Sequence, residues 1–181
     1  MGFHTFDADR ADGLEDPERF RYCSREELLQ ELPARPERLL DLGSGTGFYT
    51  SELAPYAETV YAVDLQPAMH ARHRDNGVAE NVRLVTAEAG RLPLSEGAID
   101  AAVSTMTFHE TATTEALADL ARVLEGPFVV VDWSGTGEGA AGPPTEERFA
   151  VSEARGLLES AGFEISRGVE RPETFLLVAA A

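Results

Sequence analysis

The chain has 181 residues, of which 32 are Asp or Glu and 15 are basic, so its formal net charge is −17. All 15 basic residues are Arg, because the sequence contains no Lys. Nucleic acids and anionic membranes are bound mainly through Lys and Arg patches, so this charge excludes a general nucleic-acid binder and argues against membrane binding. The apolar content of 43% is enough to bury a core, and the length fits one domain.

The sequence also indicates where the protein works. No apolar run approaches the roughly 20 residues of a membrane span, and the acidic start lacks the pattern of a signal peptide, so we expect a cytoplasmic protein. Cys23 is the single cysteine, which excludes an intramolecular disulfide and a thiolate metal cluster. The acidic excess without Lys favours a halophilic protein, since a Debye length of about 3 Å at 1 M salt screens self-repulsion. Ordinary acidic composition is the alternative.

Residues 1–33 are predicted to form a polar lead-in followed by one helix, ahead of the main domain at residues 34–181. Ser24 and Glu27 have the spacing of a capping box, which opens a helix that Pro33 ends. The lead-in carries residues that could fold over a ligand as a lid, or simply anchor the segment to the sheet. These residues are Phe3, His4, Phe6 and Tyr22.

After the lead-in, apolar runs of strand length alternate with helical patterns. The predicted strands are 38–42, 59–63, 82–86, 99–104 and 127–132. The clearest helices are 115–124 and 152–161, where apolar residues recur at i, i+3, i+4 and i+7. This alternation predicts an α/β fold with a Rossmann-like doubly wound sheet, covered by helices on both faces in three layers, α/β/α. Two closing runs, 163–165 and 175–179, are placed to pair antiparallel, so the sheet is mostly parallel but mixed at one edge.

The segment Leu39–Thr50 reads LLDLGSGTGFYT, an apolar strand that runs through three glycines into a helix. Glycines at such a junction give a tight turn and let a ligand touch the backbone. The dinucleotide fingerprint is G-x-G-x-x-G, whereas Gly43, Gly45 and Gly47 give G-x-G-x-G, with no nearby Lys or Arg for a pyrophosphate. A tight turn that binds nothing is the alternative.

Acidic residues follow the next two predicted strands. Asp64 ends the second strand, where a carboxylate can accept hydrogen bonds from both ribose hydroxyls. Glu88 follows the third strand and could accept from an adenine amino group, while Leu65 and Met69 offer apolar surface to the ring faces. Carboxylates suit a ligand with sulfonium and ammonium groups and would repel a pyrophosphate. The pattern therefore predicts a nucleoside site for a cationic ligand.

Together these motifs resemble the class I S-adenosylmethionine-dependent methyltransferases, over nearly the whole chain from Phe6. The segments that carry the resemblance are DLGSGTGFYT, YAVDLQPAM, AEAGRLPLSEGAIDAAVSTMTFH, LADLARVLEGPFVVVDW and ESAGFEI. The segment HTFDADRADGLEDPER is similar to the lead-in of small methyltransferases of ubiquinone and menaquinone biosynthesis. The resemblance implies a seven-stranded sheet whose last strand is antiparallel, and S-adenosyl-L-methionine as the cofactor.

Carried over to this sequence, the resemblance assigns residues to each part of the cofactor. Asp41 and the glycine loop would hold the methionine part, and Ala89 would offer its backbone amide to the adenine ring. Ser104 and Thr107 would border the methionine and the transferred methyl group. The predicted cofactor-binding residues are thus Asp41, Gly43, Ser44, Gly45, Thr46, Gly47, Asp64, Leu65, Met69, Glu88, Ala89, Ser104 and Thr107.

Methyl transfer is an in-line displacement in which the protein chiefly positions the reactants, so a base is needed only if the acceptor must lose a proton. His109 follows the fourth predicted strand and is the candidate general base. A packed or loop-stabilising His109 is the alternative. Glu110, Asp132 and Trp133 lie near the same edge of the sheet and are candidates for the pocket wall.

His70 and His73 lie three residues apart on a predicted helix, which is a spacing that metal ligands can have. We predict no metal there, because no acid or cysteine completes a site. A solvated helix face explains both residues.

Residues 134–145 contain four Gly and two Pro, and we expect a mobile loop. Relatives often carry an extra helix here that shapes the acceptor pocket, so this acceptor site would be open or completed by a second subunit in a homodimer. The predicted function is methyl transfer from S-adenosylmethionine to a small-molecule acceptor. The alternatives are a non-catalytic S-adenosylmethionine-binding module and an NAD-dependent oxidoreductase, which the glycine spacing and the missing Lys disfavour.

Overall fold

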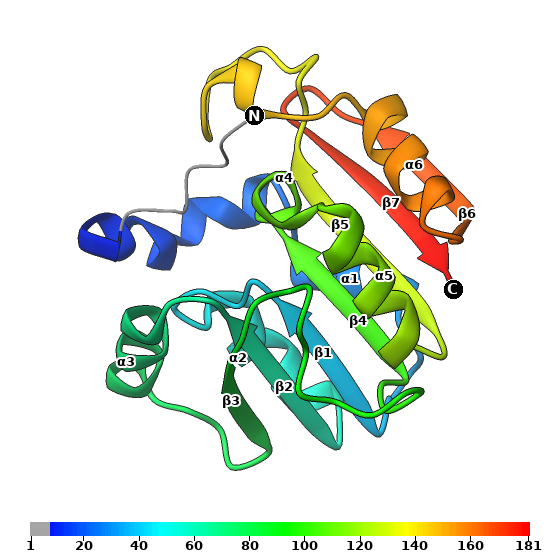
Figure 1. Ribbon diagram of the computed structural model, residues 1–181. Coiled ribbons are helices and arrows are strands. Elements are labelled where there is room, and N and C mark those ends of the chain that lie inside the picture. The colour runs from blue at the N-terminus through cyan, green and yellow to red at the C-terminus, as the bar shows by residue number, and fades with distance from the viewer. Residues whose placement is uncertain (1–7) are drawn as a thin grey trace.

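The computed structural model describes residues 8–181 and is built on a seven-stranded sheet with the order β3-β2-β1-β4-β5-β7-β6 (Figure 1). Neighbouring strands pair in parallel except at β7, which runs antiparallel to β5 and β6. The strands are β1 Arg38–Leu42, β2 Thr59–Asp64, β3 Val82–Thr86, β4 Ala101–Thr105, β5 Pro127–Trp133, β6 Glu164–Glu170 and β7 Thr174–Ala180. The predicted mostly parallel, doubly wound sheet with an antiparallel last strand is confirmed.

Helices cover both faces of the sheet. On one face Leu28 and Leu53 of α1 and α2 are fully buried against the strands, and on the other Leu120 and Leu158 of α5 and α6 are fully buried. Figure 1 shows α5 and α6 in front of the sheet and α1 behind it. The α-helices are α1 Arg25–Glu31, α2 Phe48–Leu53, α3 Pro67–Asn76, α4 Phe108–Thr111, α5 Thr114–Val123 and α6 Val151–Ser160. The 3₁₀ helices are η1 Ala8–Glu15, η2 Pro17–Arg21, η3 Ala54–Tyr56 and η4 Thr145–Glu147.

Most element boundaries lie within a residue or two of the prediction. Strand β4 begins at Ala101, later than expected, because Ile99 makes only an isolated bridge to Leu124. Helix α6 ends at Ser160, and Gly162 follows two residues later with φ +95°, as a glycine at a helix C-terminus should. Strand β7 lies between β5 and β6, so the closing hairpin extends the sheet with its last strand on the inside.

The lead-in is packed on the sheet through α1 and η2. Ser24 accepts the amide of Glu27 at 3.2 Å and caps α1 as predicted. The Glu27 side chain, however, pairs with Arg171 at 2.7 Å, which ties the helix to the end of the sheet. Tyr22 stacks on Trp133 with ring centroids 5.0 Å apart. The other three residues of the predicted lid, Phe3, His4 and Phe6, lie outside the described residues.

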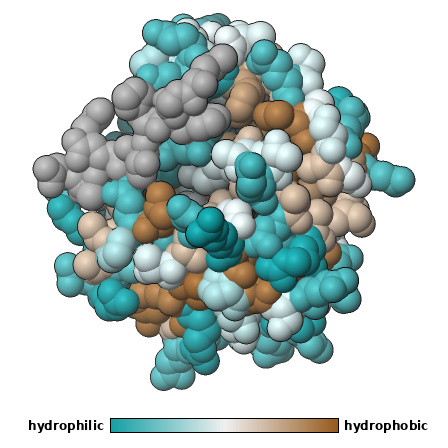
Figure 2. All heavy atoms as spheres, viewed as in Figure 1, coloured by the Kyte–Doolittle hydropathy of each residue, from teal (hydrophilic) through white to brown (hydrophobic). Residues whose placement is uncertain are grey.

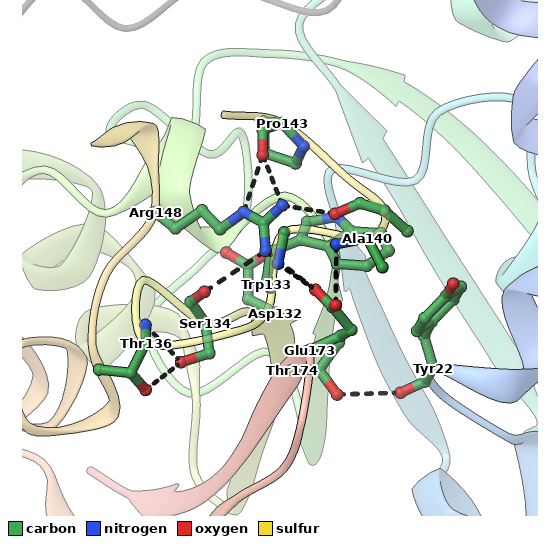
Figure 3. Close-up of polar contacts among 12 residues, drawn as sticks. Tyr22, Asp132, Trp133, Ser134, Thr136, Ala140, Pro143, Arg148, Glu173 and Thr174 are labelled. Atoms are coloured by element: carbon green, nitrogen blue, oxygen red, sulfur yellow. Dashed lines mark hydrogen bonds and ion pairs between the residues drawn. The ribbon is translucent and has the colours of Figure 1, made fainter. Parts of the chain in front are cut away.

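The glycine-rich segment after β5 is built around a buried ion pair (Figure 3). The Arg148 guanidinium donates to the carbonyl of Pro143 at 2.6 and 2.8 Å and lies 3.4 Å from the Glu173 carboxylate. Glu173 in turn accepts the amides of Gly139 and Ala140 at 3.2 and 2.9 Å. Two charged side chains distant in sequence thus satisfy backbone groups of the loop, while its mobility stays a prediction.

Hydrophilic residues predominate on the face of the molecule shown in Figure 2, with apolar residues in small patches between them. Tyr56 and Leu65 are the large apolar side chains recorded as exposed in the described part of the chain, at 40% and 51%. Across residues 8–181, the structure contains no helix with both the length and the apolar character to cross a bilayer.

Candidate cofactor site

The glycine segment forms a tight turn between β1 and α2. Gly43, Gly45 and Gly47 have φ values of +80°, +54° and +89°, a backbone region that favours glycine. The Gly43 amide donates to the carbonyl of Val63 at 2.8 Å, which ties the turn to β2. A Cβ atom on Gly43 would lie 2.3 Å from the Thr107 side chain, so only glycine lets these two segments approach so closely.

Two adjoining cavities open at the carboxyl ends of the parallel strands. The first, the loop cavity, is lined by Leu14, Arg19, Gly43, Ser44, Gly45, Thr46, Phe48, Tyr49, Asp64, Leu65, Gln66, Met69, Thr105, Met106, Thr107, Glu110 and Thr111. The second, the β3 cavity, measures about 400 Å³ and is lined by Leu42, Gly43, Val63, Asp64, Leu65, Ala87, Glu88, Ala89, Gly90, Arg91, Glu110, Thr111, Thr113, Glu115 and Ala116. Five residues line both, so the two cavities adjoin, and the β3 cavity alone has the size that small ligands occupy.

Asp64 lies at the end of β2, where the two cavities meet. Its Oδ2 accepts the amide of Gly45 and its Oδ1 accepts the amide of Gln66, both at 2.8 Å. Each carboxylate oxygen has two lone pairs, so acceptor capacity remains for ribose hydroxyls. Asp64 therefore holds the glycine turn and also faces the ligand space.

The four residues predicted around the adenine ring border the joined cavities. Glu88 and Ala89 line the β3 cavity just beyond β3. Leu65 lines both cavities with 51% of its surface exposed, which leaves an apolar side chain uncovered where a ring could lie. Met69 lines the loop cavity and is otherwise buried.

Two predicted residues lie behind the cavity wall. Asp41 is buried under the glycine turn, where its Oδ2 accepts a hydrogen bond from Thr50 Oγ1 at 2.5 Å. Burial raises the pKa of this carboxyl to about 6. Ser104 is fully buried, and Thr105 lines the cavity instead, because successive residues of a strand point to opposite faces. Thr107 lies in the wall as expected.

Several buried polar atoms around the turn have no hydrogen-bond partner within the described part of the chain. They are Asp41 Oδ1, Ser44 Oγ, Thr46 Oγ1 and Ser104 Oγ. Buried polar groups in folded proteins are almost always paired, so unpaired atoms grouped at a cavity suit a polar ligand. The Ser44 and Thr46 hydroxyls in the cavity wall, with the Asp41 carboxylate behind it, fit the ammonium and sulfonium end of S-adenosylmethionine. The glycine turn lets such a ligand approach the backbone closely.

His109, the candidate base, lies in α4 and is 7% exposed. Its Nδ1 is 3.0 Å from both oxygens of Asp132, and its amide donates to Asp132 Oδ2 at 2.6 Å. Burial lowers the pKa of His109, but the carboxylates of Asp132 and Glu110 outweigh it and raise the pKa above its usual value. His109 lines neither cavity, whereas Glu110 lines both. This geometry supports the loop-stabilising alternative for His109.

The histidines of α3 correct one expectation from the sequence. His70 and His73 are 1% and 0% exposed, so a solvated helix face does not explain them. His70 Nδ1 lies 3.0 Å from Thr86 Oγ1, and the His73 ring packs so closely on Gly47 that a Cβ there would lie 2.3 Å away. Burial lowers the pKa of both imidazoles. Helix α3 has few apolar residues, so these rings fill its buried side, which its own periodicity does not reveal.

The loop cavity also contains residues that the sequence does not single out. Phe48, Tyr49 and Met106 each lie within two residues of a predicted site residue, so adjacency to a motif could have found them. Met106 has φ +58°, the one non-glycine residue at positive φ in the part of the chain described, and such strain clusters at functional sites. Leu14 and Arg19 come from η1 and η2, and no local pattern indicates that these segments reach the cavity.

The sheet order, the glycine turn after β1 and the acids at the tips of β2 and β3 define a class of protein: Rossmann-like α/β proteins that bind a nucleoside cofactor at this edge. Comparison with known proteins makes the assignment specific. A family model described as "Methyltransferase domain" matches residues 40–127. An S-adenosylmethionine-dependent methyltransferase from Aquifex aeolicus is 30% identical with a TM-score of 0.88, and the match covers 97% of this chain and 98% of that one.

Curated relatives agree over part of their length. A demethylmenaquinone methyltransferase from Thermus thermophilus is 40% identical over 61% of this chain and 54% of its own. A malonyl-[acyl-carrier protein] O-methyltransferase from Geobacter sulfurreducens is 41% identical over 54% of this chain and 38% of its own. This chain belongs to the S-adenosylmethionine-dependent methyltransferases. The predicted family, enzyme class and cofactor are thus confirmed.

Proposed function

We propose that the chain transfers a methyl group from S-adenosylmethionine to a small-molecule acceptor by in-line displacement. The observation that carries the proposal is the pair of adjoining cavities bounded by the glycine turn, Asp64 and Glu88, with Thr107 in the wall of the loop cavity. When bound, the cofactor supplies an electrophilic methyl group on a sulfonium, so the protein mainly has to position and desolvate the reactants.

In this proposal each part of the cofactor contacts different residues of the two cavities. Asp64 accepts the ribose hydroxyls, and Glu88 with the Ala89 amide takes the edge of the adenine ring between Leu65 and Met69. The glycine turn, Gly43 to Gly47, approaches the methionine part, with Asp41 acting from behind it as a negative charge. Thr107 lies where the acceptor meets the methyl group, and Ser104 acts only through the packing beneath it. The burial and cavity positions given above support these roles.

A small acceptor is supported by charge and by relatives. A net charge of −17 disfavours a nucleic-acid acceptor, since the phosphate backbone would be repelled. The relatives described above are named for demethylmenaquinone and for malonyl-[acyl-carrier protein], so quinol precursors and carboxylic acids are the first acceptors to test. We propose that His109 holds α4 in place through Asp132, and that no dedicated base is required when the acceptor is already a nucleophile.

Two measurements test the proposal. Calorimetry should show binding of S-adenosylmethionine and S-adenosylhomocysteine and none of NAD. Turnover should then appear against a panel of quinol precursors, carboxylic acids, small amines and thiols. Cofactor binding without turnover on any acceptor would favour the non-catalytic binding module, and NAD binding would favour the oxidoreductase.

A further inference from the structure

Arg19 is a cation in the wall of the loop cavity, and it forms no ion pair with the acidic side chains described at residues 11–181. It lies in η2, and its guanidinium carbon is 5.1 Å from the ring centroids of both Phe48 and Tyr49. Its Nη1 donates to the Leu14 carbonyl at 2.6 Å, and its Nη2 lies 3.7 Å from the sulfur of Met106. Burial lowers the pKa of Arg19, which means that its charge is held where water solvates it poorly.

The other arginines whose side chains are described and at least half-buried each pair with a carboxylate. Arg148 pairs with Glu173, and Arg38 pairs with Asp100 at 2.8 Å. Arg19 has no carboxylate oxygen within 4.0 Å among the side chains described at residues 11–181. A buried charge is costly unless it is paired, and a guanidinium has five donors that match a carboxylate. Among the described side chains Glu15 and Asp41 act on Arg19 only at longer range, so its guanidinium keeps donor capacity for an anionic ligand in the cavity.

We propose that Arg19 binds the carboxylate of a ligand in the loop cavity. The inference rests on the proposed function, because it takes that cavity as the place of the cofactor's methionine end. Two ligands could supply this chemistry: the amino-acid carboxylate of the cofactor, or a carboxylic acid acceptor beside it. The arrangement favours the cofactor, since the Arg19 cavity is also the cavity of the glycine turn.

The position of Arg19 in the lead-in adds a consequence. Arg19 holds the Leu14 carbonyl, and the Leu14 side chain lies beside Gly45 of the turn. A second link is the exposed ion pair between Asp12 and Arg72 of α3, at 2.6 Å. A carboxylate bound to Arg19 would therefore hold η1 and η2 against the glycine turn.

The experiment compares S-adenosylhomocysteine, which has the carboxylate, with 5′-methylthioadenosine, which has the same nucleoside and thioether but no amino acid. Arg19→Met should weaken S-adenosylhomocysteine about 10- to 100-fold, the loss expected for charge-assisted hydrogen bonds, and leave methylthioadenosine within about twofold. Arg19→Lys should retain part of the difference. Arg21→Met is the matched control, since Arg21 is exposed in the same 3₁₀ helix, and it should change neither affinity.

The outcomes separate the proposals. If the wild-type protein binds neither nucleoside, the cofactor site itself is wrong. If both nucleosides bind to the wild type, and Arg19→Met lowers the affinity for both equally while its thermal midpoint is unchanged, Arg19 does not bind a carboxylate. If Arg19→Met leaves the affinity for S-adenosylhomocysteine unchanged, malonate is titrated onto the S-adenosylhomocysteine complex of each protein. Malonate binding that is lost in Arg19→Met supports a role in binding an acceptor carboxylate. Equal malonate binding by Arg19→Met and the wild type overturns the inference.

Discussion

Buried polar groups around the glycine turn differ from those in the loop beyond β5. At the turn, buried hydroxyl and carboxylate atoms of Asp41, Ser44 and Thr46 have no partner among the described residues. Beyond β5, the buried Arg148 and Glu173 satisfy each other and the loop between them. Buried polar groups of the scaffold have to find hydrogen-bond partners within the protein, whereas those of a ligand site can be paired by the ligand. The difference therefore separates the ligand site from the scaffold.

The largest effect should come from breaking the scaffold pair. Arg148→Met leaves the buried Glu173 carboxylate unpaired, so the free energy of unfolding should fall by about 3 to 5 kcal/mol. Urea denaturation measures this, with Arg155→Met on the exposed side of α6 as the control. The folded fraction should bind S-adenosylhomocysteine normally. A loss of binding in protein that is still folded would show that the loop beyond β5 belongs to the site.

A substitution around the glycine turn should instead change the affinity for the cofactor. Asp64→Ala removes the acceptor for the ribose hydroxyls and for the Gly45 amide, and should weaken S-adenosylmethionine by about 1.5 to 3 kcal/mol in calorimetry. Asp75→Ala, an exposed acid on α3, should change the affinity little. An Asp64→Ala protein that binds as tightly as the wild type would refute the ribose assignment.

His109 lies between these two regions, and its substitution tests whether it stabilises the scaffold or acts in catalysis. His109→Asn should lower the free energy of unfolding by about 1 to 2 kcal/mol, because the ion pair with the Asp132 carboxylate becomes at most a hydrogen bond from a neutral amide. The folded pKa of His109 is raised, so its contribution is full below about pH 6.5 and is lost as the pH rises through the folded pKa. The gap between variant and wild type should therefore narrow with rising pH. Turnover that falls by more than about a hundredfold would restore His109 as a base.

The pH dependence of binding tests Asp41 alone. With a pKa of about 6, this carboxyl loses its charge as the pH falls through that value, and the attraction for a cationic cofactor is lost with it. If the bound cofactor lowers the pKa by one unit, the affinity should drop about tenfold on the acid side. Asp41→Asn should bind with a flat profile over this range. A wild-type profile that is flat too would mean that Asp41 does not act on the ligand.

Salt should have the smallest and least local effect. Between low and multimolar KCl, screening of the net charge of −17 should raise the free energy of unfolding by on the order of 1 to 2 kcal/mol. The thermal midpoint should rise by several degrees as a result. The increment should be the same in Arg148→Met as in the wild type, because a buried pair is screened little. A midpoint that ignores salt would leave ordinary acidic composition as the explanation.

Much of the site could be predicted because its parts are local. The glycine spacing, Asp64 at a strand end and Glu88 after the next strand are all fixed within short windows, and the parallel sheet then brings strand ends to one edge. Ser104 lies beneath the cavity wall and Thr105 lines it, because successive residues of a strand point to opposite faces, and which face meets the ligand space is set by the packing of the sheet. The burial of His70 and His73 could not be read from α3, because the glycine turn and β3 supply the surfaces that cover it.

By itself, the sequence determined the alternation of strands and helices, the family and the chemistry of the acids, since these depend on residue type and short-range spacing. Only the tertiary structure decided which charges stay unpaired. Arg19 and Arg148 are both arginines in polar segments, yet folding gives one a buried Glu173 and places the other in a cavity. The reason is physical: the partner of a buried charge is chosen by proximity in space, and residues 25 positions apart, as Arg148 and Glu173 are, leave no local pattern.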